Sequence, residues 1–254
     1  MPAGIVIVPL RNMKTRILVV LCLCWFGGKA QFTDSTHYYV SYAATGIINQ
    51  TNDGSSYVLT NNFKFNVRKK SISLNSTNNW MYGQQNRQLS NNDFGSTLDF
   101  NLYKGPKHFF FWGLANYTTS FSLKINDQLQ AGAGGAYDVL NRKNALINIS
   151  NGILYEKSDL MMNDTTRDVY STMRNSFRLR FHFELQNLFV IESSSFLQNS
   201  FRHSSDYIVR SVTSVSVKLR QWLSLTTSLN YNKFNRTQRE TLLLNFGLTA
   251  EKYF

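Results

Sequence analysis

The sequence predicts an all-β fold, a transmembrane antiparallel up-and-down β-barrel of about 12 strands that fills residues 31–254 as one domain. Three observations lead to this prediction. Apolar and polar residues alternate with period two in one segment after another, the links between these segments differ regularly in length, and no stretch from Gln31 to Phe254 holds 18 consecutive apolar residues. Alternation is the pattern of strands with one apolar and one polar face, and the lack of a long apolar run excludes membrane-spanning helices.

The first thirty residues have the pattern of a cleaved secretory signal peptide. Lys14 and Arg16 precede an apolar run from Ile17 to Phe26, and small residues lead up to a predicted cut after Ala30. The run is too short to cross a bilayer as a helix, which needs about 20 apolar residues. Residues 1–12 lie upstream of Met13, and we expect Met13 to be the true start.

The positions of the two cysteines limit the reactions that the exported chain can perform. Both Cys22 and Cys24 lie in the signal, so no disulfide or thiolate chemistry is expected after cleavage. A lipid-anchored cysteine is an alternative that the large residues before each cysteine disfavour.

The chain has a formal net charge of +12, and removal of the signal, which holds four Lys/Arg and no Asp/Glu, leaves +8. An exported chain does not routinely meet nucleic acid, so we expect no nucleic-acid partner. The predicted partners are outer-membrane lipids and the phosphates of lipopolysaccharide, and scattered surface charge is the alternative explanation.

The period-two pattern assigns the strands in order. From Leu223 to Asn232 the odd positions are mostly apolar and the even positions are Ser, Thr or Asn, and from Phe177 to Leu185 five apolar residues alternate with charged ones. Weaker examples complete the set. The predicted strands are 37–48, 56–68, 71–83, 91–103, 108–118, 126–140, 145–156, 170–184, 187–196, 206–219, 222–232 and 240–254.

The predicted links alternate between two kinds. Links after even-numbered strands are tight, as at Lys69-Lys70, whereas links after odd-numbered strands are longer and polar, as in Asn49–Ser55, Glu156–Asp168 and Leu197–Ser205. Outer-membrane barrels have short periplasmic turns and longer external loops. The pattern therefore predicts the cell outer membrane of a Gram-negative bacterium, with both mature termini in the periplasm.

A soluble secreted β-barrel is the alternative fold, because alternation alone does not say which face points outward. The last strand ends in the aromatic Phe254, with Phe246 and Leu248 on the same face, and this favours a C-terminal signal read by the barrel-insertion machinery. Lys252 departs from that pattern. Aromatic residues near the strand ends, Trp112 among them, are predicted to form girdles at the level of the lipid headgroups.

Two neighbouring segments resemble the YdiY-type family of salt-induced outer-membrane proteins, a family of unknown function. The first is the glycine-rich stretch Ala131–Leu140, and the second is Asn148–Glu156, which ends in Tyr-Glu after a tight turn. The resemblance implies a single barrel, no assigned chemistry and, from the composition, a Bacteroidetes source. Glycine also recurs in barrels for geometric reasons, because it permits strand bending.

Catalytic and metal-binding chemistry finds little support in the sequence. The four histidines, His37, His108, His182 and His203, show no metal-ligand spacing, so we predict no metal, no cofactor and no catalytic residue. The alternative is an outer-membrane lipid- or peptide-bond hydrolase with His182 or His203 as the base. Such an enzyme would place a serine or a carboxylate beside its histidine at the outer rim.

The predicted site is instead the barrel lumen. The polar faces of the strands carry charges of both signs, and a cluster is expected near the periplasmic end, formed by Arg178, Arg180, Glu184, Lys218 and Arg220. The other charges assigned to the lumen are Lys64, Arg68, Asp99, Asp138, Glu156, Arg210 and Glu251. These charges predict a non-enzymatic barrel, either closed by ion pairs and structural or stress-linked, or open as a narrow, weakly anion-selective channel.

Overall fold

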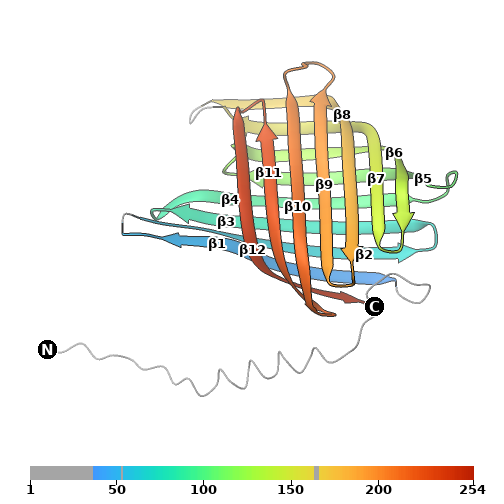
Figure 1. The fold of residues 1–254 in the computed structure, drawn as a ribbon. Coiled ribbons are helices and arrows are strands. Elements are labelled where there is room, and N and C mark those ends of the chain that lie inside the picture. Colours follow the sequence, from blue (N-terminus) through green and yellow to red (C-terminus); the bar gives the residue numbers. More distant parts are fainter. Residues whose placement is uncertain (1–36, 53, 163–165) are drawn as a thin grey trace, which may run out of the picture.

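Twelve antiparallel strands build the part of the protein that the computed structural model describes, residues 37–52, 54–162 and 166–254 (Figure 1). The predicted signal peptide lies outside these residues, as do the predicted cut after Ala30 and the predicted start at Met13. The strands are β1 (Tyr38–Gln50), β2 (Ser55–Lys69), β3 (Ile72–Gln85), β4 (Gln88–Leu102), β5 (Phe109–Ser120), β6 (Ile125–Arg142), β7 (Ala145–Met161), β8 (Arg167–Leu185), β9 (Phe189–Ser200), β10 (Tyr207–Arg220), β11 (Leu223–Phe234) and β12 (Arg239–Tyr253).

The sheet closes on itself without crossovers. Each strand pairs with the next, and β1 pairs with β12 in a register that runs from Tyr39 opposite Tyr253 to Gly46 opposite Phe246. Closure leaves no unpaired edge, which a membrane-spanning sheet requires because lipid offers no hydrogen-bond partners. The predicted up-and-down barrel of 12 strands is confirmed. No helix in the described ranges is long and apolar enough to cross a membrane.

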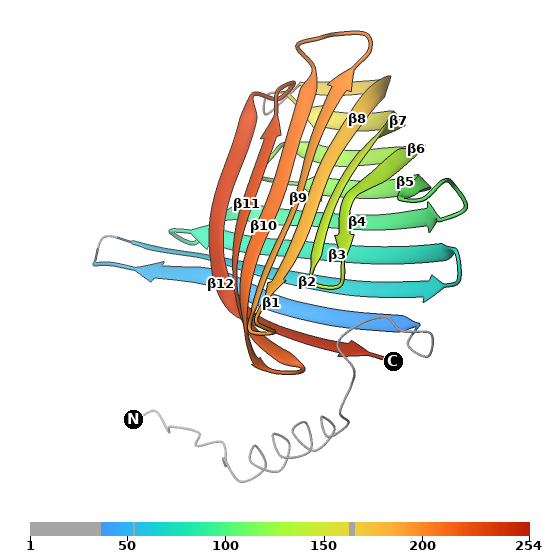
Figure 2. The same ribbon diagram turned by 45° about the vertical axis from the view of Figure 1, so that its right-hand side comes forward.

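The two walls of the barrel cross one another. Strands β1 to β4 run across the view in Figure 1 and β9 to β12 run up it, and Figure 2 shows β6 and β7 bending from one direction into the other. Strands in a closed barrel tilt from its axis by about 35–45°, so opposite walls cross at a large angle. A small barrel with this tilt brings side chains of opposite walls within reach of one another.

Apolar residues point outward and polar residues point inward. On β12, Leu242 is 64% and Phe246 is 53% exposed, whereas Asn245 between them is 0% exposed. A soluble barrel would bury the apolar face instead, since water is a poor solvent for a continuous apolar surface. The arrangement is that of an outer-membrane-type barrel, in which lipid covers the outer face.

The links after odd-numbered strands and those after even-numbered strands differ less in length than the sequence predicts. The predicted loop Glu156–Asp168 is largely strand, because β7 continues to Met161 and β8 begins at Arg167. The link between β3 and β4 is only Asn86-Arg87, both with positive φ, as a two-residue hairpin turn requires. We call the end with the even-to-odd links and Phe254 the turn end, and the opposite end the loop end.

The lengths of these links predict that the turn end faces the periplasm, and single cysteines test this orientation. Ser204, in the β9–β10 link, is exposed at the loop end, and Pro106 is exposed at the turn end. We expect an impermeant thiol reagent to label Ser204→Cys on intact cells and to label Pro106→Cys only after lysis. The opposite result would place the turn end outside the cell.

Candidate functional site: the barrel lumen

The structure places four of the five residues of the predicted lumen cluster inside the barrel. Lys218 Nζ of β10 lies 2.6 Å from Glu184 Oε1 of β8, across the intervening strand β9. Arg178 and Arg180 share the inward face of β8 with Glu184. Arg220 is exposed at the end of β10 after a register shift, and it makes no ion pair with any described residue.

A buried ion-pair network lies in the loop-end half of the lumen. Arg174 of β8 binds Glu156 of β7 through two hydrogen bonds of 2.8 and 2.9 Å, and both side chains are 0% exposed. Arg174 Nη2 also donates to Asp206 Oδ1 at 2.8 Å, from the link between β9 and β10. Tyr170 and Gln130 donate to the remaining lone pairs of the Glu156 carboxylate at 2.6 Å. We call Glu156, Arg174, Asp206, Arg236 and Asp168 the plug.

Arg236 joins the plug to a second link, the one between β11 and β12. Its guanidinium donates to Asp168 at 2.7 Å and to Asp206 at 3.1 Å, and it lies 3.7 Å from the ring centre of Tyr170. Burial opposes the charge of Arg236, but the hydrogen bonds to Asp168 and Asp206 outweigh it, so the pKa of Arg236 is raised above its ordinary value. Arg236 therefore ties the β11–β12 link to β8 and to the β9–β10 link, and it stays charged.

An apolar cluster packs beside the plug at the same end. Tyr170 contacts it, and its five members come from four strands and the β5–β6 link: Leu123, Ile125, Leu160, Ile208 and Phe234. Each is at most 6% exposed. Large apolar side chains inside a barrel exclude water from the charges beside them, which strengthens the hydrogen bonds of the plug.

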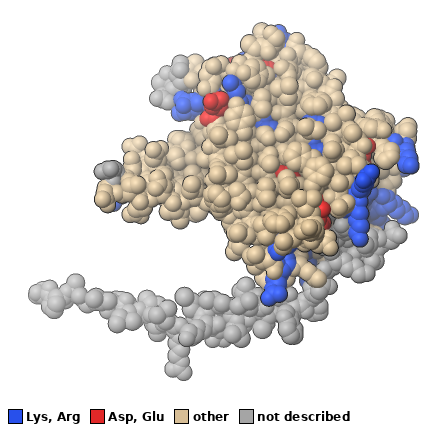
Figure 3. All heavy atoms as spheres, in the orientation of Figure 1, with Lys and Arg blue, Asp and Glu red and all other residues tan. Residues whose placement is uncertain are grey.

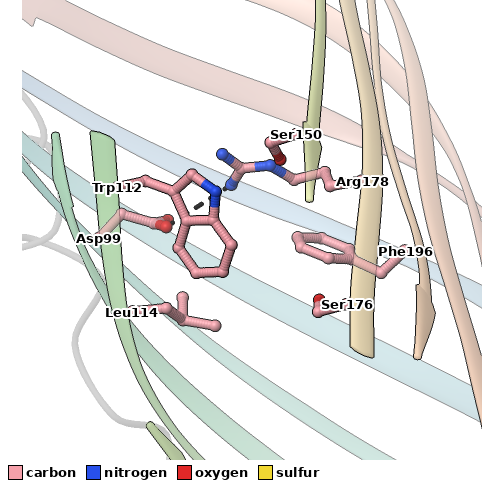
Figure 4. A pocket seen from close by; sticks show the side chains of 7 residues that line it. All are labelled: Asp99, Trp112, Leu114, Ser150, Ser176, Arg178 and Phe196. Carbon is pink, nitrogen blue, oxygen red and sulfur yellow. Dashed lines mark ion pairs between the residues drawn. The ribbon is translucent and has the colours of Figure 1, made fainter. Parts of the chain in front are cut away.

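Aromatic and charged residues cross the middle of the lumen. Arg178 reaches from β8 toward Asp99 of β4, 3.5 Å away, and both line a cavity with Trp112 and Phe196 (Figure 4). Asp99 Oδ1 and Arg178 Nε have no hydrogen-bond partner among the described residues. The cavity measures about 10 Å³, room for roughly one water molecule.

The predicted girdle residue Trp112 lies inside the lumen and is 6% exposed. Its position depends on two glycines, because Trp112 pairs with Gly134 and Gly134 pairs with Gly152 on the next strand. A Cβ on Gly134 would lie 2.7 Å from Trp112 Cζ2. The indole therefore occupies the space that two side chains would fill.

The turn-end half of the lumen is more open. Lys64 of β2 lies 3.8 Å from Glu192 of β9, and these side chains are 39% and 40% exposed although both point into the barrel. His182 donates to or accepts from Glu192 at 2.9 Å and is 31% exposed. Such exposure inside the wall indicates a water-filled vestibule. Arg180 is exposed in it and makes no ion pair with a described residue.

The structure contains only part of the site that a hydrolase would need. His182 has a carboxylate beside it, as a base requires, but the pair lies in the turn-end half and not at the loop end, which the sequence predicts to be the outer rim. No hydroxyl of a described residue hydrogen-bonds to His182. His203 contributes only its carbonyl oxygen, which accepts from Asp206 N at 3.0 Å. In the described ranges no group of three or more His, Cys, Asp or Glu residues could hold a metal ion.

Sequence reasoning missed Arg174, Glu192, Asp206 and Arg236. Arg174 precedes Arg178 by two alternation steps, so the period-two pattern could have placed it on the inward face, and Glu192 lies inside predicted strand 187–196. Asp206 begins predicted strand 206–219 two alternation steps before Arg210, so the same pattern could have placed it on the inward face. Arg236 lies in a link, where no periodicity indicates a direction.

Comparisons with known proteins agree with this fold. A model of the family described as "Protein of unknown function, DUF481" matches residues 43–250, and the chain belongs to that family. Among solved structures, the NanC porin is similar at 7% identity, with 84% of this chain and 99% of that chain covered and a TM-score of 0.51. An outer membrane channel from Pseudomonas putida F1 is similar at 8% identity, with 90% and 99% covered and a TM-score of 0.50.

At such low identity, these two similarities show the fold alone, an outer-membrane-type barrel. The search of curated proteins gave no match.

Proposed function

We propose that the protein is a narrow channel of the outer membrane, non-enzymatic and closed at the loop end by the plug in the described conformation. The observation that carries this proposal is the fully buried Glu156–Arg174 pair and its attachment to two loop-end links. The solved neighbours that share the fold are a porin and an outer membrane channel, which supports the same class of function.

The chemistry of the plug favours a gate over a purely structural core. A buried ion pair adds little net stability, because desolvation offsets most of its attraction, and an apolar filling of the same volume is often as stable. The plug also depends on Asp206 and Arg236, which lie in links, and links are the parts of a barrel that move most easily. Movement of these links can therefore open the loop end without breaking the barrel wall.

We further propose a weak preference for anions. Arg180 in the vestibule has no ion pair among the described residues, and Arg210 in the loop-end half hydrogen-bonds only to the neutral Gln128, at 2.8 Å. The acids of the lumen are mostly paired, as Glu184 is with Lys218 and Asp99 with Arg178. Uncompensated positive charge raises the local concentration of anions along a narrow water-filled path.

Conductance in planar bilayers tests this function. We expect the native barrel to conduct rarely and the Asp206→Asn/Arg236→Gln variant to conduct at least several-fold more often, with anions preferred at low salt. The variant removes the Asp206 charge that pairs with Arg174 and the ion pairs that hold the β11–β12 link to Asp168 and Asp206. Salt should weaken the preference, since the screening length falls from about 10 Å at 0.1 M to about 3 Å at 1 M.

A matched control is Lys233→Gln, which removes an exposed ion pair with Glu240 at the same end. This control should behave as the native protein does. A large unselective pore in the native protein, or an unchanged opening frequency in the double variant, would contradict the proposal.

The cellular setting is part of the same proposal. It comprises export by the signal at residues 1–30, insertion through the C-terminal strand ending in Phe254, and residence in the outer membrane among its lipids and lipopolysaccharide. A stress-linked role and a Bacteroidetes source are further expectations from the sequence. The position of Phe254 supports the insertion step, because its ring is 54% exposed at the end of the closing strand.

A further inference from the structure

The turn end carries a basic surface that the channel proposal does not use. Exposed cations, and no Asp or Glu, lie on three neighbouring links of the turn end and on the strand ends beside them. These links are β2–β3, β4–β5 and β6–β7. We call these six residues the basic arc: Lys69, Lys70, Lys104, Lys107, Arg142 and Lys143. Lys and Arg gather along the right-hand edge of the molecule in Figure 3, the edge at which Figure 1 shows the β2–β3 turn.

The three links lie side by side. Tyr103 N, next to Lys104, donates to the carbonyl oxygen of Ser71, next to Lys70, at 2.7 Å. Asp138 N of β6 donates to the carbonyl oxygen of His108, next to Lys107, at 2.8 Å. The arc is therefore one continuous stretch of rim rather than cations scattered around the barrel.

The arc lies next to exposed aromatic rings. On the outer face, Phe100 of β4, Phe111 of β5 and Tyr137 of β6 are 41%, 52% and 46% exposed, and each lies within a few residues of the turn-end links. Aromatic side chains of barrels mark the level of the lipid headgroups. The cations follow directly beyond this level, at the depth where headgroup phosphates lie.

The described residues of the loop end form no such surface. Its cations alternate with acids, and several are paired, as Arg167 is with Asp159, Lys233 with Glu240 and Arg236 with Asp168. By contrast, Lys69, Lys70, Lys104, Lys107 and Arg142 make no ion pair with a described residue. The net positive charge of the described residues is thus concentrated on the rim at the turn end.

We propose that the basic arc binds the phosphate headgroups of anionic phospholipids in the leaflet at the turn end. Clusters of Lys and Arg beside a membrane attract anionic lipid by about 1 kcal/mol per cation, which corresponds to about fivefold in affinity. With the turn end in the periplasm, as the sequence predicts, this contact is made with the inner leaflet of the outer membrane, on the side opposite to the lipopolysaccharide. It is independent of whether the lumen conducts.

Lipid retention by the purified full-length barrel tests the proposal. The barrel is placed in mixed micelles with equal amounts of phosphatidylglycerol and phosphatidylcholine, and retained lipid is counted by native mass spectrometry. We expect phosphatidylglycerol to be retained in preference to phosphatidylcholine, and Lys104→Gln/Lys107→Gln to weaken that preference about 25-fold at low salt, the product of two fivefold steps.

The matched control is Arg87→Gln/Arg202→Gln, which removes two exposed cations from the loop end. We expect this control to keep the native preference, and the heat-modifiable gel mobility of both variants should show that the barrel is folded. An equal effect in the control, a native barrel without preference between the two lipids, or displacement of the lipid by millimolar inorganic phosphate would overturn the proposal.

Discussion

Replacement of Arg174 by methionine is expected to lower the free energy of unfolding by about 3–5 kcal/mol, because the carboxylate of Glu156 then stays buried without its cation. Glu156 is 0% exposed, so water cannot take the place of the guanidinium. The substitution also removes the hydrogen bonds from Arg174 to Asp206. Urea titration of the barrel in detergent, followed by tryptophan fluorescence and by heat-modifiable gel mobility, measures the change.

The double variant Glu156→Gln/Arg174→Met separates a stranded charge from lost packing. It removes both charges at similar volume, and we expect it to recover most of the stability that Arg174→Met loses, since a neutral buried pair has no charge to desolvate. If the double variant were as unstable as the single one, packing rather than the charge of Glu156 would explain the loss, and the ionic account of the plug would be wrong.

Replacement of Gly134 by valine is expected to cost about 3 kcal/mol or more, because the added atoms overlap with a closely packed wall. A Cβ at Gly134 would lie 2.6 Å from the Cα of Gly152 and 2.7 Å from Trp112 Cζ2, distances at which the backbone must move. Gly134 and Gly152 lie on β6 and β7, and Figure 2 shows these strands bending from one wall of the barrel into the other. The same urea titration measures the loss, together with the yield of folded barrel.

Gly95→Val is the matched control, because a Cβ at Gly95 meets no atom within 4 Å. We expect it to change stability by no more than about 0.5 kcal/mol. Removing the indole in Gly134→Val/Trp112→Ala should restore only part of the stability, since the overlap with the Gly152 backbone persists. A cost at Gly95 equal to that at Gly134 would show that glycine is needed for strand conformation in general rather than for this contact.

The sequence predicts the wall of the barrel well, because the wall imposes one rule on every residue. Lipid lies on one side and water or polar side chains on the other, so strands must alternate with period two. All twelve predicted strands are present, and even the facing of Lys64 and Asp99 follows from alternation. Link lengths were predicted less well, since strands such as β7 continue past the last clearly alternating residue.

By itself, then, the sequence determined the barrel, its strand order and the alternation that turns polar residues of a strand inward, although it assigned Trp112 to the girdle rather than to the lumen. Only the tertiary structure decided which of these residues meet, because lumen contacts join strands far apart in the chain, as Arg178 of β8 joins Asp99 of β4. It also decided that Asp206 and Arg236, on two links far apart in the chain, complete a plug around Arg174. Tilt and closure of the sheet set these distances, and neither is encoded in a local pattern of residues.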